Sequence, residues 1–415
     1  MTDHTHTSEN TTKDLRTWRT TLAAMFIAQF LSGVGFSFVL PFFPFFFRSL
    51  GVESQEAVLR WNGWSALVFG VTMTVSAPIW GILADRYGRK LMVIRSMLAA
   101  SIILGLMGFA TQPWHLLVLR LFQGATTGTV TASITLVSSI SKPSNRGFSL
   151  GLMQTAILLG AAAGPLLGGV LAEQYGFKVS CALASVLLLS GFVFVITGTT
   201  ERFTRPAKKK IRSVRQLKDI ITISGFKMLM LIYFLVYVLS YMIVPILPLY
   251  IEALSGKQTG AESLTGIFVG VTFLITGLSA IVYGKLGDRY GYKKILLFSL
   301  IATGIVTIPQ SMAPSTTVLF IERCIFGLSI GGLIPSVNAL ISRIVPRHAI
   351  GSAYGLTSAV TCFGIGMGPF IGGLLASVAG LRLPFVVMGL SAIALAVGVQ
   401  KMFHPHRMNL SAGEV

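Results

Sequence analysis

The chain has 415 residues, of which 53% are hydrophobic and 11% are charged, and its formal net charge is +19. Soluble domains carry about 25% charged residues, so this composition excludes a water-soluble globular protein. The positive charge alone would suit a nucleic-acid partner, but the way the charges are distributed argues against one.

Twelve apolar segments are long enough to cross a membrane, for which about 20 residues are needed. They begin near residues 21, 61, 91, 114, 147, 179, 226, 264, 294, 316, 350 and 383. A polar, basic stretch at 201–225 separates the sixth from the seventh. We therefore expect an N-terminal tail (1–20), a six-helix bundle (21–200), a linker (201–225), a second six-helix bundle (226–402) and a C-terminal tail (403–415).

Basic residues are distributed unevenly between the predicted loops. Of 33 lysines and arginines, 22 lie in the even-numbered loops and the C-terminal tail, and five lie in the odd-numbered loops. Nine of the 22 lie between Arg202 and Lys227. Because basic loops stay inside, both termini and the linker are predicted to be cytoplasmic. The linker is interpreted as a topology determinant beside anionic lipid, and docking of nucleic acid or protein is the less favoured alternative.

The first predicted span, near residues 21–49, contains no acidic residue. It offers Gln29, Ser32 and Ser37, and it ends near Pro41 and Pro44. Its phenylalanines are predicted to line a cavity, with core packing as the alternative; they are Phe36, Phe38 and Phe42.

Residues 81–90 read Gly-Ile-Leu-Ala-Asp-Arg-Tyr-Gly-Arg-Lys and join the second and third spans. Gly81 allows close approach of a neighbouring helix, and Gly88 allows a tight turn. Asp85 is a carboxylate at the membrane edge that can pair with an arginine or with a helix N-terminus and so latch the halves. The alternative is a simple membrane-edge anchor. The basic residues that hold the loop inside are Arg86, Arg89 and Lys90.

A glycine-rich run at residues 160–169 lies inside the fifth span. Pro165 removes a helix hydrogen bond, and glycines one turn apart allow helices to approach at their backbones. A functional seal between helices and a simple packing seam are both open interpretations. The glycines of this run are Gly160, Gly164, Gly168 and Gly169.

The seventh span places Tyr233, Tyr237 and Tyr241 four residues apart, which puts them on one face of a helix. Tyr237 and Tyr241 lie too deep for an interfacial belt. This face is predicted to line the cavity or to pack inside the protein.

Charged residues inside spans are costly and indicate function by default. Glu322 is the only acidic residue clearly inside a span, and the basic ones are Arg95, Arg120 and Arg323. A carboxyl group whose arginine neighbour changes with conformation can bind and release a proton. Glu322, with Arg120 as its arginine partner, is the first candidate for this role, and Asp85 is the second. A fixed structural ion pair is the alternative.

The sequence lacks the patterns of nucleotide, metal or hydrolytic chemistry. It has no Gly-x-x-x-x-Gly-Lys-Ser/Thr, His-Glu-x-x-His or Gly-x-Ser-x-Gly run, and its three cysteines have no metal-site or disulfide spacing. We expect no enzyme activity and no cofactor. Any transport across the membrane would then have to be driven by an ion gradient or by the gradient of the substrate itself.

Several of these features occur twice, 203 or 204 residues apart. Residues 284–293 repeat 81–90 as Gly-Lys-Leu-Gly-Asp-Arg-Tyr-Gly-Tyr-Lys, with Gly284, Asp288, Arg289 and Gly291 in matching positions. Arg323 repeats Arg120, 368–373 repeat 164–169, and Pro245 and Pro248 repeat Pro41 and Pro44. A duplicated membrane chain has the architecture of a transporter. The predicted fold is an all-α membrane protein with twelve transmembrane helices in two pseudo-symmetric six-helix bundles.

The two copies at 81–90 and 284–293 resemble the loop signature of the major facilitator superfamily. Residues 160–169 resemble the fifth-helix signature of its proton-coupled antiporters, and Leu119–Gly124 resembles the fourth-helix signature. Pro41 and Pro44 resemble the first-helix motif of the twelve-helix drug:proton antiporters, and residues 91–96 and 284–289 resemble the fosfomycin/deoxycholate exporter subgroup. The resemblance implies that 160–169 seals the halves at the outer side.

Taken together, these features predict a proton-coupled multidrug-type exporter, a monomer in the inner membrane of a bacterium. Its partners are small-molecule substrates, protons and the lipid bilayer, without nucleic acid. A cavity with three arginines and one glutamate favours anionic or neutral amphiphiles; its predicted lining is Gln29, Phe36, Arg95, Arg120, Tyr233, Tyr237, Tyr241 and Arg323. An importer or facilitator, and a receptor or sensor of the same fold, remain alternatives.

Overall fold

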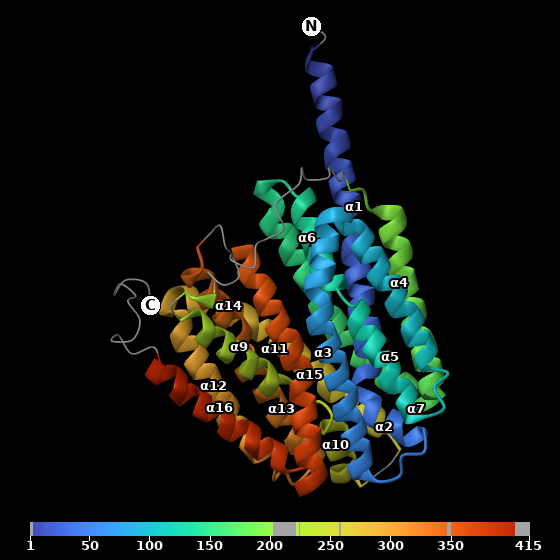
Figure 1. The fold of residues 1–415 in the computed structure, drawn as a ribbon, viewed down its shortest axis with the longest axis vertical. Helices are drawn as coiled ribbons and strands as arrows, with labels where there is room; N and C mark the ends of the chain where they lie inside the picture. The colour runs from blue at the N-terminus through green and yellow to red at the C-terminus, as the bar shows by residue number, and fades with distance from the viewer. Residues whose placement is uncertain (1–2, 202–220, 224, 257–258, 347–349, 403–415) are drawn as a thin grey trace.

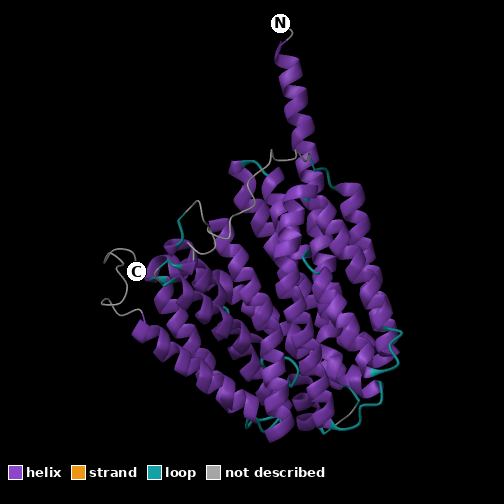
Figure 2. Ribbon diagram, viewed as in Figure 1, coloured by secondary structure: helices purple, strands orange, loops and turns teal. Residues whose placement is uncertain are grey.

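The computed structural model describes residues 3–201, 221–223, 225–256, 259–346 and 350–402. Within these ranges the chain forms helices and loops, without a strand (Figure 2). The predicted linker and C-terminal tail fall mostly outside the described residues. Two helical bundles lie side by side, one from each half of the chain (Figure 1).

The N-terminal half begins with α1, which starts at Asp3, so the polar residues before the first apolar segment continue its helix out of the bundle (Figure 1). Pro41 and Pro44 interrupt this helix near its far end, where a short 3-10 turn separates α1 from α2. The elements of this half are α1 (Asp3–Val39), η1 (Leu40–Phe42), α2 (Phe43–Ser49), α3 (Gln55–Tyr87), α4 (Arg89–Met107), α5 (Pro113–Thr126), α6 (Thr129–Ile140), η2 (Pro143–Asn145) and α7 (Arg146–Gly198).

The C-terminal half repeats this plan. A turn around Pro245 separates α9 from α10, as the first-helix prolines separate α1 from α2. Its elements are α9 (Phe226–Tyr241), α10 (Leu247–Ser255), α11 (Ala261–Tyr290), α12 (Tyr292–Gln310), α13 (Thr316–Ile330), α14 (Leu333–Ile344), α15 (Ile350–Ala379) and α16 (Leu383–Met402).

Ten helices in the described part of the chain are long and apolar enough to cross a membrane. The longest, α7, comprises two of the predicted spans, because Gly176 has a φ of 77° and breaks the helix between them. The short helices α5 and α6 together make one more, which is interrupted at Thr127 and Gly128. This organisation agrees with the twelve spans expected from hydropathy.

The two ends of the molecule differ in how closely the halves meet. We call the end where α3 turns into α4 and α11 into α12 the signature end, because residues 81–90 and 284–293 lie there. The halves approach each other at the opposite end, where α2 contacts α10 (Figure 1). They diverge toward the signature end, where α6 and α14 lie in separate bundles.

Glycines let α3 of the first half and α15 of the second half touch at their backbones. A methyl group added to Gly70 would lie 2.5 Å from the Cα of Gly366, and one added to Gly63 would lie 3.3 Å from the Cα of Phe370. Beyond this seam toward the signature end, the Thr74 hydroxyl lies within 3.4 Å of the Ala359 carbonyl oxygen. The seam therefore occupies the part of these helices nearer the opposite end.

A second seam joins α7 with α11 on the other side of the molecule. A methyl group on Gly270 would lie 2.6 Å from the Leu166 side chain and 2.7 Å from the Ala162 carbonyl oxygen. One on Gly169 would lie 2.5 Å from the carbonyl oxygen of Glu262. The two seams are equivalent under the duplication, since each joins one helix from either half.

Candidate functional site

The residues of the glycine-rich run divide between two neighbours. Gly160 and Gly164 face α1, where a methyl group on either would lie 2.7 Å from a backbone oxygen, of Phe30 and Val34 respectively. Gly168 also packs on α1, against Phe38. Pro165 and Gly169 instead meet α11 of the other half, at Gly266 and Glu262. The run therefore packs its own bundle and also contributes to the seam between the halves.

The repeat of this run in α15 behaves in the same way. A methyl group on Gly364 would lie 2.7 Å from the Tyr237 Cβ, and one on Gly368 would lie 2.5 Å from the Val238 carbonyl oxygen, both in α9 of the same half. Gly366 and Gly373 face α3 of the first half. Both copies thus combine packing inside one bundle with contact across the molecule.

The three tyrosines of α9 share one face, as their spacing predicts. The rings of Tyr233 and Tyr237 meet edge to face with centroids 5.1 Å apart, and those of Tyr237 and Tyr241 stack 6.2 Å apart. The Tyr233 hydroxyl donates to the side-chain oxygen of Asn338 in α14 at 2.9 Å. The row runs along a helix that also packs on α15, and the predicted role of the tyrosines in lining a cavity stays a prediction.

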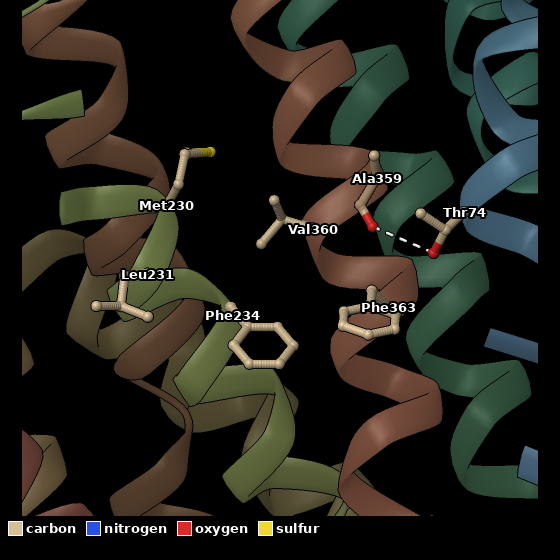
Figure 3. A pocket seen from close by; sticks show the side chains of 7 residues that line it. All are labelled: Thr74, Met230, Leu231, Phe234, Ala359, Val360 and Phe363. Atoms are coloured by element: carbon tan, nitrogen blue, oxygen red, sulfur yellow. Dashed lines mark hydrogen bonds between the residues drawn. The ribbon is translucent and has the colours of Figure 1, made fainter. Parts of the chain in front are cut away.

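An open apolar pocket of about 390 Å³ lies along α9 and α15 of the C-terminal half, next to α3 of the first half. Figure 3 shows side chains of α9 and α15 facing it, with Thr74 of α3 at its edge. The rings of Phe234 and Phe363 stack 5.6 Å apart at its wall. Sequence reasoning did not select these residues because, apart from Thr74, they are apolar positions within predicted spans and carry no motif. The lining is Thr74, Met230, Leu231, Phe234, Ala359, Val360 and Phe363.

Arg120 is buried in the N-terminal bundle among aromatic rings and one amide. Its Nη1 donates to the side-chain oxygen of Gln123 at 2.7 Å. Its guanidinium carbon lies 4.1 Å from the ring centroid of Phe69 and 5.3 Å from that of Phe43. Its Nε is buried without a hydrogen-bond partner in the structure. No carboxylate of the described residues forms an ion pair with it.

Arg323 occupies the equivalent place in the C-terminal bundle. Its guanidinium carbon lies 5.0 Å from the Phe326 ring centroid and 5.4 Å from that of Phe385. Its Nε and Nη2 are buried without hydrogen-bond partners. The duplication thus places Arg120 and Arg323 at matching positions of the two bundles, each held chiefly by ring faces.

Glu322, next to Arg323 in α13, is half-buried, and its Oε2 has no hydrogen-bond partner. Arg323 and Tyr250 are its electrostatic neighbours in the same half. Within the described chain, no ion pair joins Glu322 to Arg120. The proposed exchange between these two residues therefore requires a conformation other than this one.

Arg95 and Gln29 lie inside the N-terminal bundle. The Arg95 guanidinium stacks on Trp80 with its carbon 3.2 Å from the ring centroid, and Trp80 donates to the Ala125 carbonyl oxygen at 2.7 Å. Arg95 thus lies beside the break between α5 and α6. Gln29 is buried in α1, and its Oε1 has no partner in the structure.

The phenylalanines of the first span differ in how deeply they are buried. Phe38 and Phe42 are fully buried in the core, and Phe36 is half-buried against it. Phe38 and Phe42 therefore pack in the core, which is the alternative to lining a cavity.

The two signature loops are not packed against the other half. Asp85 is exposed and has no hydrogen bond or ion pair in the described structure, and nothing lies within 4 Å of a methyl group placed on Gly81 or Gly284. Asp288 accepts a 2.6 Å hydrogen bond from the Tyr292 hydroxyl of its own half. A latch formed by Asp85 is therefore not engaged in this conformation.

Arg89 and Lys90 take part in contacts that sequence reasoning missed. Glu201 accepts from the backbone N–H groups of Arg89 at 2.9 Å and Lys90 at 2.8 Å, which caps the first turn of α4. The Lys90 ammonium donates to the carbonyl oxygens of Ile196 and Thr199 at the end of α7. Each helix end thus receives the charge that suits its dipole. Glu201 is the first residue of the predicted linker, and its two partners in α4 are visible only in the fold.

An ion pair also joins the halves at the opposite end. The Arg48 Nη1 in α2 lies 2.5 Å from the Glu252 Oε2 in α10. Sequence reasoning missed this pair, although a signal existed: the two residues are 204 positions apart and occupy equivalent places after the paired prolines.

Comparisons with known proteins agree with this geometry. A sequence model of the Major Facilitator Superfamily matches residues 25–255 and 229–409. The multidrug resistance protein MdtG of Citrobacter koseri is 33% identical over 376 residues, covering 89% of this chain and 91% of the relative. The MdtG protein of Enterobacter lignolyticus is 34% identical over 387 residues, covering 92% and 91%.

Solved structures share the fold. A bacterial homologue of the human lysosomal transporter Spinster has a TM-score of 0.79 at 14% identity, covering 94% of this chain and 98% of that one. The human organic anion transporter MFSD10 has a TM-score of 0.68 at 16% identity, covering 92% and 99%. Two internally repeated six-helix bundles, both signature loops and these matches along nearly the whole chain establish that the protein belongs to the major facilitator superfamily.

Proposed function

We propose that the protein is a proton-coupled exporter of small amphiphilic compounds that works by alternating access. The observation that carries this proposal is the unequal contact between the halves. Both glycine seams and the Arg48–Glu252 pair lie toward the opposite end, whereas the signature loops make no packing contact across the molecule. Such an arrangement corresponds to one of the two states between which a rocking transporter alternates.

The orientation follows from the basic loops. Because the signature loops carry lysine and arginine, the signature end is cytoplasmic, and the conformation described is open toward the cytoplasm. An exporter in this state would receive its substrate from the cytoplasm or the inner leaflet. The relatives named as multidrug resistance proteins support export as the direction.

The preferred substrates are anionic or neutral amphiphiles. Arg120 is a buried cation that forms no ion pair with a carboxylate of the described residues, among those carboxylates Arg323 has only its neighbour Glu322 as an electrostatic partner, and the first helix brings no acidic residue to balance them. An uncompensated buried charge is costly, so an anionic substrate group would gain more at such sites than a cationic one. The apolar pocket beside α9 and α15 supplies surface for an apolar group.

Proton coupling is assigned to Glu322, with Asp85 as the second candidate. A carboxyl group inside a spanning helix without a hydrogen-bond partner at Oε2 can accept a proton without breaking an existing contact. Arg120 is proposed as the arginine that approaches the Glu322 carboxyl group in another conformation. The protein is proposed to act as a monomer and without a bound cofactor.

Purified protein in liposomes with an imposed pH gradient tests the proposal. Substrate movement against its gradient, opposite in direction to proton flow, is expected for one anionic and one neutral amphiphile, and weaker movement for a cationic analogue. Movement in the same direction as the protons would identify an importer. Binding without transport would identify a receptor. A collapsed pH gradient serves as the control.

A further inference from the structure

Arg48 and Glu252 stand at equivalent positions of the two halves. Each lies in the short helix that follows a proline-containing break, Arg48 in α2 and Glu252 in α10. Without the breaks the longer helices would continue straight, so the prolines position the two end segments to meet. The result is an ion pair across the junction of the halves, at the end where they close.

This pair is partly shielded from water. The side chain of Arg48 is 31% exposed and that of Glu252 is 15% exposed. Ring packing surrounds the residues before Arg48, where Phe46 stacks on Phe177 of α7 with centroids 5.0 Å apart. A charge pair in such a place is screened less than one on the open surface.

Two further carboxylates lie beside the pair. Glu262 at the start of α11 interacts electrostatically with Glu173, Glu252 and Arg48. Glu173 belongs to the N-terminal half, and Glu252 and Glu262 belong to the C-terminal half. Arg48 is therefore the one cation among these four groups, and it faces carboxylates of the other half across the junction.

We infer that Arg48 and Glu252 form the outer gate, an ion pair that holds the halves together in the cytoplasm-open state and must separate before the outer side opens. The inference rests on the proposed alternating-access function. Removal of Arg48 leaves Glu262 beside Glu252 and facing Glu173 of the other half without a cation among them, and like charges repel. Removal of Glu252 still leaves Arg48 to interact with Glu262 across the junction. Loss of the arginine should therefore open the outer side more than loss of the glutamate.

The test measures a distance across the outer side by double electron–electron resonance. Spin labels are placed at Glu53 and Met312, which are exposed in loops of different halves at this end. The background has Cys181, Cys324 and Cys362 replaced by alanine and is first shown to remain folded. An open outer side appears as a longer distance between the labels.

Arg48→Ala is expected to raise the ratio of long to short distances about fivefold, which corresponds to about 1 kcal/mol, and Glu252→Ala by less. The double exchange Arg48→Glu with Glu252→Arg should return the ratio toward that of the parent. Arg60→Ala is the matched control, because Arg60 pairs with Glu56 at the same end but within α3. It should leave the ratio unchanged.

Parent-like ratios in both single variants would overturn the inference, as would a double exchange that stays as open as Arg48→Ala. Thermal melts of each protein show whether it is folded, and if a single variant is not, the double exchange alone decides. Transport by the parent protein is measured separately in liposomes. Absence of transport with a normal response of the distances would refute the proposed export and leave the gate standing.

Discussion

Glu322 and Arg323 are neighbours in α13 but have different surroundings. Arg323 is buried between the rings of Phe326 and Phe385, whereas Glu322 is less buried and leaves Oε2 without a partner. Adjacent residues point to different faces of a helix, so one can be structural while the other changes protonation. This separation of roles makes single substitutions informative.

Glu322→Gln is expected to abolish export driven by a pH gradient, because the amide cannot carry the proton. Substrate binding and substrate exchange should persist, since neither requires net proton movement. Uptake into inverted vesicles after a pH jump measures the first, and exchange in liposomes measures the second. A fixed structural role would instead appear as a lower melting temperature, and full proton-driven export by a stable variant would move the search to Asp85.

Asp85→Asn should reduce export about tenfold, the effect of losing one charge-assisted hydrogen bond. The side chain is exposed and unpartnered here, so the substitution leaves this state intact and removes a contact of the other state. Initial transport rates and a thermal melt check both parts. Glu53→Gln, which changes an exposed acidic residue at the opposite end, is the control. Equal transport rates in the two variants would mean that Asp85 is only a membrane-edge anchor.

At the scale of elements, the seam between α3 and α15 depends on the absence of side chains. Gly366→Ala would place its methyl group 2.8 Å from the Cα of Gly70 and 2.9 Å from the Ala66 carbonyl oxygen, so the helices must move apart. Overpacking of this kind costs about 1–3 kcal/mol. We expect a lower melting temperature and a longer distance between labels at Glu53 and Met312.

Gly398→Ala is the matched control for that substitution. It also lies in a helix of the C-terminal half, but nothing lies within 4 Å of the added methyl group. Alanine should stabilise α16 by about 0.5–1 kcal/mol through its helix propensity. Equal melting temperatures for the two variants would mean that the seam tolerates a methyl group.

Elements of this fold were predictable where they depend on local composition. Hydropathy predicted the spans, and the repeats at 81–90 and 284–293 predicted the two halves. The break between α5 and α6 was not predicted. It lies at Thr127 and Gly128, inside a segment that hydropathy treats as one span. The ring faces around Arg120 and the caps between Glu201 and α4 come from distant segments, so only the folded chain shows them.

At the scale of the whole molecule, orientation determines the direction of every gate. A cysteine at Lys209, in the basic linker, should react with membrane-impermeant thiol reagents only after cells are opened. Labelling at Glu53→Cys, on the opposite end, should occur in intact cells. Mass shift or fluorescence of the labelled protein measures both, and the reverse pattern would invert the assignment of the cytoplasmic side.

The opposite charges of Arg48 and Glu252 also bear on how the two halves recognise each other. Equivalent positions of a duplicated chain would meet as identical residues if one half paired with a copy of itself, because a twofold interface brings the same patch together. Two arginines or two glutamates would then face each other and repel. If the halves were expressed as separate polypeptides, the charges at this one position would disfavour each homodimer and select the mixed pair.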